Sequence, residues 1–117
     1  MNKIYVTGSK NCDNYTLIKQ KLDYHLKDKL PNVVIVSGEA DGVELLAEKY
    51  AVERDLDICS FPIDWQKHGK QAAVIRNNIL CDFIDSCLIF WDGISKDTGY
   101  VVGMAKKKGL PYKIIRY

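Results

Sequence analysis

Five short apolar runs, regularly spaced along the 117-residue chain, constrain the fold more than any other feature of the sequence. Each run is rich in Val, Ile, Tyr or Phe and is continuous rather than alternating. This pattern is typical of strands that are buried on both faces of a parallel sheet. The predicted strands occupy residues 3–8, 33–38, 57–62, 87–93 and 112–117.

Four helical patterns separate these runs. Their apolar residues recur every three or four positions, as on the buried face of a helix. Asn14 is predicted to cap the first helix, and Gly109 with Pro111 to end the last one. The helices are expected at about residues 14–29, 42–54, 70–83 and 98–108. Strand and helix therefore alternate, which predicts a three-layer α/β sandwich over residues 1–117, a single domain at this length.

The composition excludes several classes of protein. A net charge of +2 is too small to indicate nucleic-acid or membrane binding, and nucleic acid is expected to be an unlikely partner. The basic cluster at 106–108 is explained by the dipole of the helix that it ends. Four scattered cysteines without metal-ligand spacing indicate a reducing compartment and no metal site. No signal segment or membrane-spanning run is present, so a cytoplasmic location without a membrane partner is expected.

The unusual segments of the chain all follow predicted strands. Ligands in parallel α/β sheets bind beyond the carboxyl ends of the strands, beside the point where strand order reverses. The segments that converge on this edge are "TGSKN" (7–11), "SGEADG" (37–42), "FPIDWQKHGK" (61–70) and "WDGISKDTG" (91–99). This convergence is the strongest physical argument for a binding site.

Arg76 is the strongest individual candidate, because its fork of donors suits phosphate and it flanks the apolar stripe of its helix. Asn77 adds an amide that could read a base or sugar. Asp64, Trp65 and Lys70 precede them closely, which favours a shared ligand over a set of unrelated surface residues.

The other loops are open to more than one interpretation. The turn at Gly8 and Ser9 could cradle phosphate or be a tight turn, and it matches neither the Walker loop nor the GxGxxG pattern. Gly38 and Gly42 could belong to a ligand loop or to an ordinary turn before a helix. Thr98 could cap its helix or donate to a phosphate.

Two alternatives fail on the residues. A phosphoacceptor receiver domain needs an acidic pair after the first strand, and "TGSK" has none. A cysteine phosphatase needs Cys-x5-Arg, and none of the four cysteines has Arg at that offset.

Four motifs together resemble the YspA-type branch of the SLOG superfamily, over about residues 3–115. They are "VTGS", "SGxAxG", "FPxDWxxxGKxAxxxRN" and "FWDGxSKxT". This superfamily is Rossmann-like and includes the Lonely Guy phosphoribohydrolases and DprA. The resemblance implies a Rossmann-like three-layer sandwich with a five-stranded, mainly parallel sheet. It also implies a ligand site that comprises Gly8, Ser9, Gly38, Gly42, Asp64, Trp65, Gly69, Lys70, Arg76, Asn77, Ser95 and Thr98.

The chain departs from the family pattern in two loops. The usual Gly-Gly-Ala-Arg-Gly-Ala-Asp has Glu39 for the second Gly, Asp41 for the Arg and Glu44 for the Asp. In the fourth loop Asp97 replaces a Gly beside the expected phosphate, which its carboxylate would repel. These acids weaken the expectation of a strongly anionic ligand.

The resemblance also bears on catalysis. Lonely Guy enzymes need a glutamate where this chain has Val101, which can transfer no proton, so a catalytic role is disfavoured and no catalytic residue or cofactor is assigned. The leading hypothesis is a domain that binds a nucleotide-like small molecule, with Arg76 and Lys70 on phosphate, Trp65 stacked on a base, and Asp64 or Asn77 reading sugar or base.

Three alternatives remain open. The first is a phosphoribohydrolase-like enzyme that uses Asp64 or Asp97 as its acid, the second a single-stranded DNA-binding module, and the third an interaction module without a ligand. A homodimer is possible, although no interface is indicated.

Overall fold

The sheet has five strands, all parallel, in the order β3-β2-β1-β4-β5. The structure, a computed structural model, describes all residues from Met1 to Tyr117. The strands are β1 (Asn2–Gly8), β2 (Val33–Ser37), β3 (Asp57–Ser60), β4 (Ser86–Phe90) and β5 (Tyr112–Ile115). The predicted fold class is confirmed, and the sheet is wholly rather than mainly parallel.

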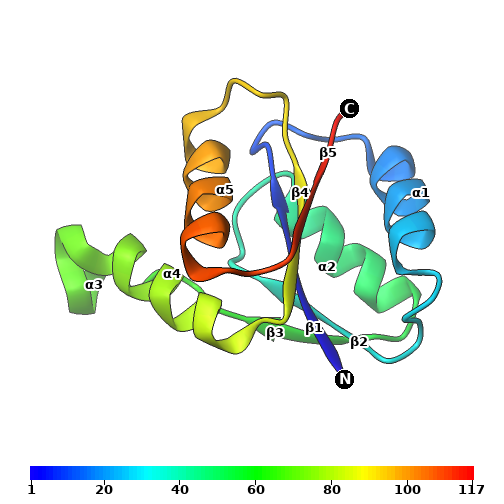
Figure 1. The fold of residues 1–117 in the computed structure, drawn as a ribbon, viewed down its shortest axis with the longest axis horizontal. Coiled ribbons are helices and arrows are strands. Elements are labelled where there is room, and N and C mark those ends of the chain that lie inside the picture. Colours follow the sequence, from blue (N-terminus) through cyan, green and yellow to red (C-terminus); the bar gives the residue numbers. More distant parts are fainter.

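Helices cover both faces of this sheet (Figure 1). Helices α1 and α2 lie on one side, and α4 and α5 on the other. The helices are α1 (Tyr15–Leu26), α2 (Val43–Glu53), α3 (Trp65–His68), α4 (Ala72–Phe83) and α5 (Lys96–Lys108), with a 3-10 turn η1 (Gly69–Gln71) before α4. Asn14 caps α1 through a bond from the Leu17 N–H, and Gly109 ends α5 in the left-handed region, both as predicted.

Successive strand residues point into two different cores, which explains why the apolar runs are continuous. In β1, Ile4 and Val6 pack with α1 and α2, while Tyr5 packs with α4 and α5. The first core has 15 buried residues and the second only 8. The core between the sheet and the α4–α5 layer is therefore the smaller of the two.

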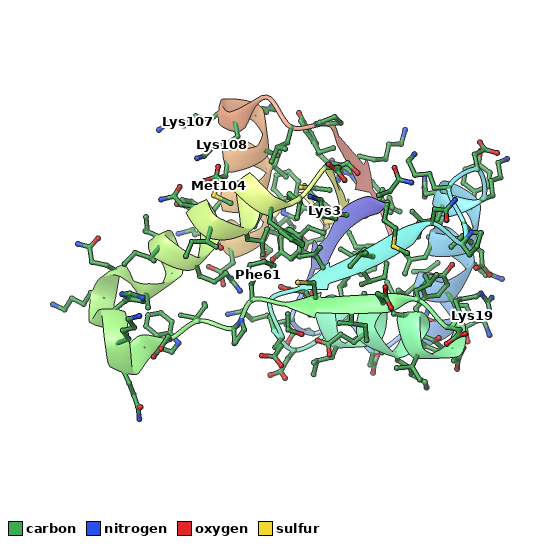
Figure 2. The ribbon with its side chains drawn as sticks, turned by 90° about the horizontal axis from the view of Figure 1, so that it is seen from below. Lys3, Lys19, Phe61, Met104, Lys107 and Lys108 are labelled. Carbon is green, nitrogen blue, oxygen red and sulfur yellow. The ribbon has the colours of Figure 1, made fainter.

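The segment from 61 to 71 differs most from expectation. The sequence predicts a strand up to residue 62 and then a loop up to about residue 70, but Asp64 accepts a hydrogen bond from the Lys67 N–H and caps the short helix α3. Figures 1 and 2 both show α3 standing off from the sheet at the far end of α4. We refer to residues 61–71 as the arm. No helix of the chain combines the length and apolar character that a bilayer crossing needs.

Candidate functional site

Strand order reverses between β1 and β4, so the loops after these two strands flank the switch point of the sheet. Lys10 and Asp97 form an ion pair across it, with Nζ and Oδ2 3.1 Å apart. Both side chains are mostly exposed, so the pair adds little stability. It places a cation beside Asp97, which the sequence did not indicate.

Two glycines at this edge are explained by close backbone packing. A Cβ at Gly42 would overlap the Ser9 carbonyl oxygen, which accepts the Val43 N–H at 3.1 Å. A Cβ at Gly8 would overlap the carbonyl oxygen of Phe90 on β4. The backbone at the ends of β1 and β4 and at the start of α2 is therefore in direct contact through Gly8, Ser9 and Gly42.

Glu44 is a buried carboxylate that joins the ends of β1 and β2. Its Oε1 accepts the Gly38 N–H at 2.5 Å, and its Oε2 accepts the Thr7 hydroxyl at 3.1 Å. Burial raises the pKa of Glu44, although these bonds and the charge of Arg76 act in the opposite direction. In the sequence, Glu44 is notable only as a replacement in the family pattern. An acidic side chain in the first turn of a helix is usually exposed and explained by the helix dipole. The local sequence therefore does not indicate that Glu44 is buried.

Arg76 is held in place by three hydrogen bonds. Its Nη1 donates to the carbonyls of Phe61 at 3.0 Å and Gly38 at 3.4 Å, and its Nε donates to Asn77 Oδ1 at 2.8 Å. Because Gly38 has no Cβ, Nη1 occupies the space where one would stand. The remaining amino group, Nη2, donates to no protein group, and since no buried side-chain nitrogen lacks a partner, it faces solvent.

A cavity of 190 Å³ lies beside Arg76, between the arm and α4. It combines an apolar wall with charged and titratable side chains. Its lining residues are Phe61, Pro62, Asp64, Lys67, His68, Ala72, Ile75, Arg76 and Ile79. We call it the Arg76 pocket. Asp64 uses Oδ1 to cap α3, which leaves Oδ2 free of protein hydrogen bonds.

The structure brings only some of the predicted site residues together. Asp64 and Arg76 share the Arg76 pocket, Gly38 lies behind Arg76, and the buried Asn77 orients the guanidinium. Trp65 is 58% exposed on the arm, and Gly69 and Lys70 are exposed there too, outside the lining of the pocket.

The remaining predicted residues lie at the start of α5. Ser95 occupies the N-cap position, which excludes the helix cap as one of the two alternatives for Thr98. Thr98 is one turn inside and buried, while Val101 packs against the second core. No group of three or more His, Cys, Asp or Glu side chains is arranged to hold a metal ion.

Lys67 and His68 line the pocket, although the sequence pointed to Lys70 and Trp65 instead. The signal that could have found them is the capping of α3 by Asp64. Once residues 65–68 form a helical turn, Lys67 and His68 line the pocket beside α4, into which the chain continues through η1.

A five-stranded parallel sheet with helices on both faces defines a Rossmann-like α/β fold. The family model described as "YspA, cpYpsA-related SLOG family" matches residues 2–68, more than half of the chain. The chain belongs to this family. The gene 61 protein of Mycobacterium phage D29 is a relative with 29% identity over 117 residues, which span 95% of this chain and 94% of that protein.

Two solved structures of DNA processing protein A (DprA) share the fold. The Streptococcus pneumoniae protein aligns with a TM-score of 0.72 at 16% identity, and the Helicobacter pylori protein with 0.65 at 21%. Both alignments cover 97% of this chain but only 50% and 64% of the respective DprA chains. The Helicobacter pylori structure concerns the binding of single-stranded DNA by that protein.

The expectation that nucleic acid is an unlikely partner is wrong, because a protein with this fold binds single-stranded DNA. The expectation was based on the net charge of the whole chain, which does not show how the charges are distributed over the surface. Residues 37–57 hold seven acidic and two basic side chains, whereas 61–83 and 94–110 together hold seven basic and three acidic ones. A net charge of +2 averages over this separation and conceals the basic α4–α5 side of the protein.

Proposed function

We propose that this domain binds a nucleotide in the Arg76 pocket, with the phosphate on Arg76 and Lys67. The observation that carries the proposal is the state of the Arg76 side chain. Three hydrogen bonds fix the guanidinium, Arg76 lines the pocket, and its Nη2 has no protein hydrogen bond. A donor that is already ordered loses little conformational entropy when it binds an oxyanion.

The rest of the pocket suits the sugar or base of the same ligand. Phe61, Ile75 and Ile79 supply apolar contact, and the free Oδ2 of Asp64 can accept a hydrogen bond from a sugar hydroxyl. The volume of 190 Å³ is below the ~300 Å³ of pockets that enclose a whole drug-sized ligand. We therefore expect one part of the nucleotide to be enclosed and the rest to extend from the pocket.

Thermal unfolding with a panel of nucleoside mono-, di- and triphosphates tests the proposal. A nucleotide at 100 times its dissociation constant should stabilise the protein by about 2.7 kcal/mol, or on the order of 10 °C. Arg76→Lys keeps the charge but loses the fork of donors, and it should abolish most of the shift. Lys67→Ala should reduce the shift, whereas Lys70→Ala on the exposed arm should leave it unchanged.

The melting temperature of each variant without ligand is the necessary control, because Arg76 also bonds the Phe61 and Gly38 carbonyls. A wild-type shift that persists undiminished in Arg76→Lys would show that the nucleotide binds elsewhere. Loss of the shift in Lys70→Ala but not in Lys67→Ala would move the phosphate to the arm, as the sequence alone indicated.

Single-stranded DNA is the second candidate ligand. Two observations favour it: the fold is shared with a DprA that binds single-stranded DNA, and the α4–α5 side carries an excess of basic residues. A mononucleotide and a DNA strand also present the same phosphate, sugar and base groups. Binding of oligonucleotides should therefore be measured beside the nucleotide panel.

A further inference from the structure

A second concave surface lies on the α4–α5 side of the protein, apart from the Arg76 pocket. It is a groove of 510 Å³ between the two helices and shares no residue with that pocket. Its lining residues are Val74, Asn78, Tyr100, Gly103, Met104, Lys107 and Lys108. Figure 2 shows Met104, Lys107 and Lys108 on α5 where this helix faces α4. We call this surface the α4–α5 groove.

The groove exposes apolar and aromatic side chains from both helices. Tyr100, Gly103, Met104 and Lys107 recur at helical spacing, so they share one face of α5. Tyr100 is 52% exposed, and Val74 on the facing helix is 47% exposed. Gly103 has no atom within 4 Å of the position of a Cβ, so the groove stays open between Tyr100 and Lys107.

The charge of the groove is positive at one end. Lys108 is paired weakly with Asp82, with Nζ and Oδ1 3.8 Å apart, while Lys107 makes no ion pair. The helix dipole accounts for cations at the end of α5. It does not account for an exposed aromatic ring and an amide side chain in the same groove. An exposed aromatic ring together with two lysines, one of them unpaired, in one groove is typical of single-strand recognition.

We propose that single-stranded DNA binds along the α4–α5 groove. A base stacks on Tyr100 with apolar contact to Val74 and Met104, Asn78 faces the base edges, and Lys107 and Lys108 neutralise phosphates. This inference rests on the single-stranded DNA candidate above, and it places the strand on a surface other than the Arg76 pocket.

Fluorescence anisotropy with a labelled oligothymidylate of about 16 nucleotides, at several salt concentrations, tests this placement. Each phosphate contact on a single strand contributes about 0.7 to the slope of log affinity against log salt. Lys107→Ala/Lys108→Ala should therefore lower the slope by about 1.4. Tyr100→Ala should weaken binding by about tenfold or more and leave the slope unchanged, because stacking does not depend on counterion release.

Lys27→Ala/Lys29→Ala is the matched control, since it removes the same charge beyond the end of α1, on the opposite side of the sheet. It should change neither affinity nor slope. Arg76→Lys should retain oligothymidylate binding but lose the thermal stabilisation by mononucleotides. The two proposed sites can therefore be tested independently. All variants concern exposed side chains except Arg76, and their melting temperatures confirm that they fold.

Several outcomes would overturn the placement. Wild-type binding that survives both groove variants, or that Arg76→Lys abolishes, would remove the strand from the groove. No oligothymidylate binding by the wild type would refute the placement together with the single-stranded DNA candidate, while the nucleotide proposal would stand on its own panel. Tighter binding of oligouridylate would make RNA the ligand. A dimer in light scattering that Tyr100→Ala dissociates would make the groove a subunit interface.

Discussion

Gly42→Ala is expected to destabilise the protein by about 2–6 kcal/mol, a large part of the stability of a domain of this size. Two independent costs add. Gly42 has φ of +79° and ψ of −126°, a conformation that is open essentially to glycine alone. The new Cβ would also overlap the carbonyl oxygen of Ser9 and the backbone of Lys10. Both obstacles are backbone atoms, so no side chain can move aside to relieve them.

Gly103→Ala is the matched comparison for this variant. Gly103 lies inside α5 with no atom within 4 Å of the Cβ position, and its φ is outside the positive region. Alanine there should stabilise the helix by about 1 kcal/mol. Urea unfolding followed by circular dichroism measures both variants. Equal stability of Gly42→Ala and the wild type would mean that the loops after β1 and β2 are not packed as described.

The strand and helix layers were predictable because burial on both sheet faces makes a strand continuously apolar. Runs such as residues 33–37 lack the alternation of polar and apolar residues that a half-exposed strand would show. Helix ends are marked by local chemistry, as at Asn14 and Gly109. These signals depend only on neighbours in the sequence. The overall architecture therefore followed from the pattern without knowledge of tertiary contacts.

The site was less predictable because side-chain direction depends on contacts between distant segments. Arg76 was identified from its donors, but its bonds to Phe61 and Gly38 come from two other strand ends. Trp65 and Lys70 were grouped with Arg76 because they are close in sequence. The capped turn of α3 instead carries them onto an exposed arm. Proximity along the chain does not predict proximity in space once a short helix intervenes.

The net charge of the chain was also a poor predictor of its partners, because it contains no information on where the charges lie. Composition reports the sum of all charges, whereas a ligand meets only the charges on one face of the protein. Seven of the 15 acidic residues lie between 37 and 57, and the layers of the fold separate these seven from the lysines of α5. A charge count by predicted element, rather than over the whole chain, would have given single-stranded DNA more weight among the candidate ligands.

Glu44→Ala is expected to lower the free energy of unfolding by about 2–5 kcal/mol. The substitution removes the acceptor of the Gly38 N–H and the partner of the Thr7 hydroxyl, and both lie in the protein interior. Glu44→Gln retains an acceptor of nearly the same shape, so its loss should be much smaller. Thermal and urea unfolding of the two variants should separate the missing hydrogen bonds from the missing charge.

The dependence on pH distinguishes the two variants further. Burial raises the pKa of Glu44 above its ordinary value of 4.5. The unfolded chain therefore loses this proton first, and Glu44 costs stability as the pH rises through the unfolded value toward the folded one. The stability of Glu44→Gln relative to the wild type should accordingly increase over that range. Asp23, whose pKa is lowered chiefly by its bond from Arg54, has the opposite dependence, but it is present in both proteins and cancels in the comparison.

The reverse trend would be equally informative. If the wild type gains stability over Glu44→Gln as the pH rises, the carboxylate is ionised in the folded protein and favoured there by Arg76 and the Gly38 N–H. A fixed negative charge would then stand behind the guanidinium that is proposed to hold phosphate. In that case Glu44→Gln should also tighten nucleotide binding, because removal of the anion leaves more of the positive charge of Arg76 to the ligand. Titration of both proteins with the same nucleotide at neutral pH would decide between a neutral and a charged Glu44.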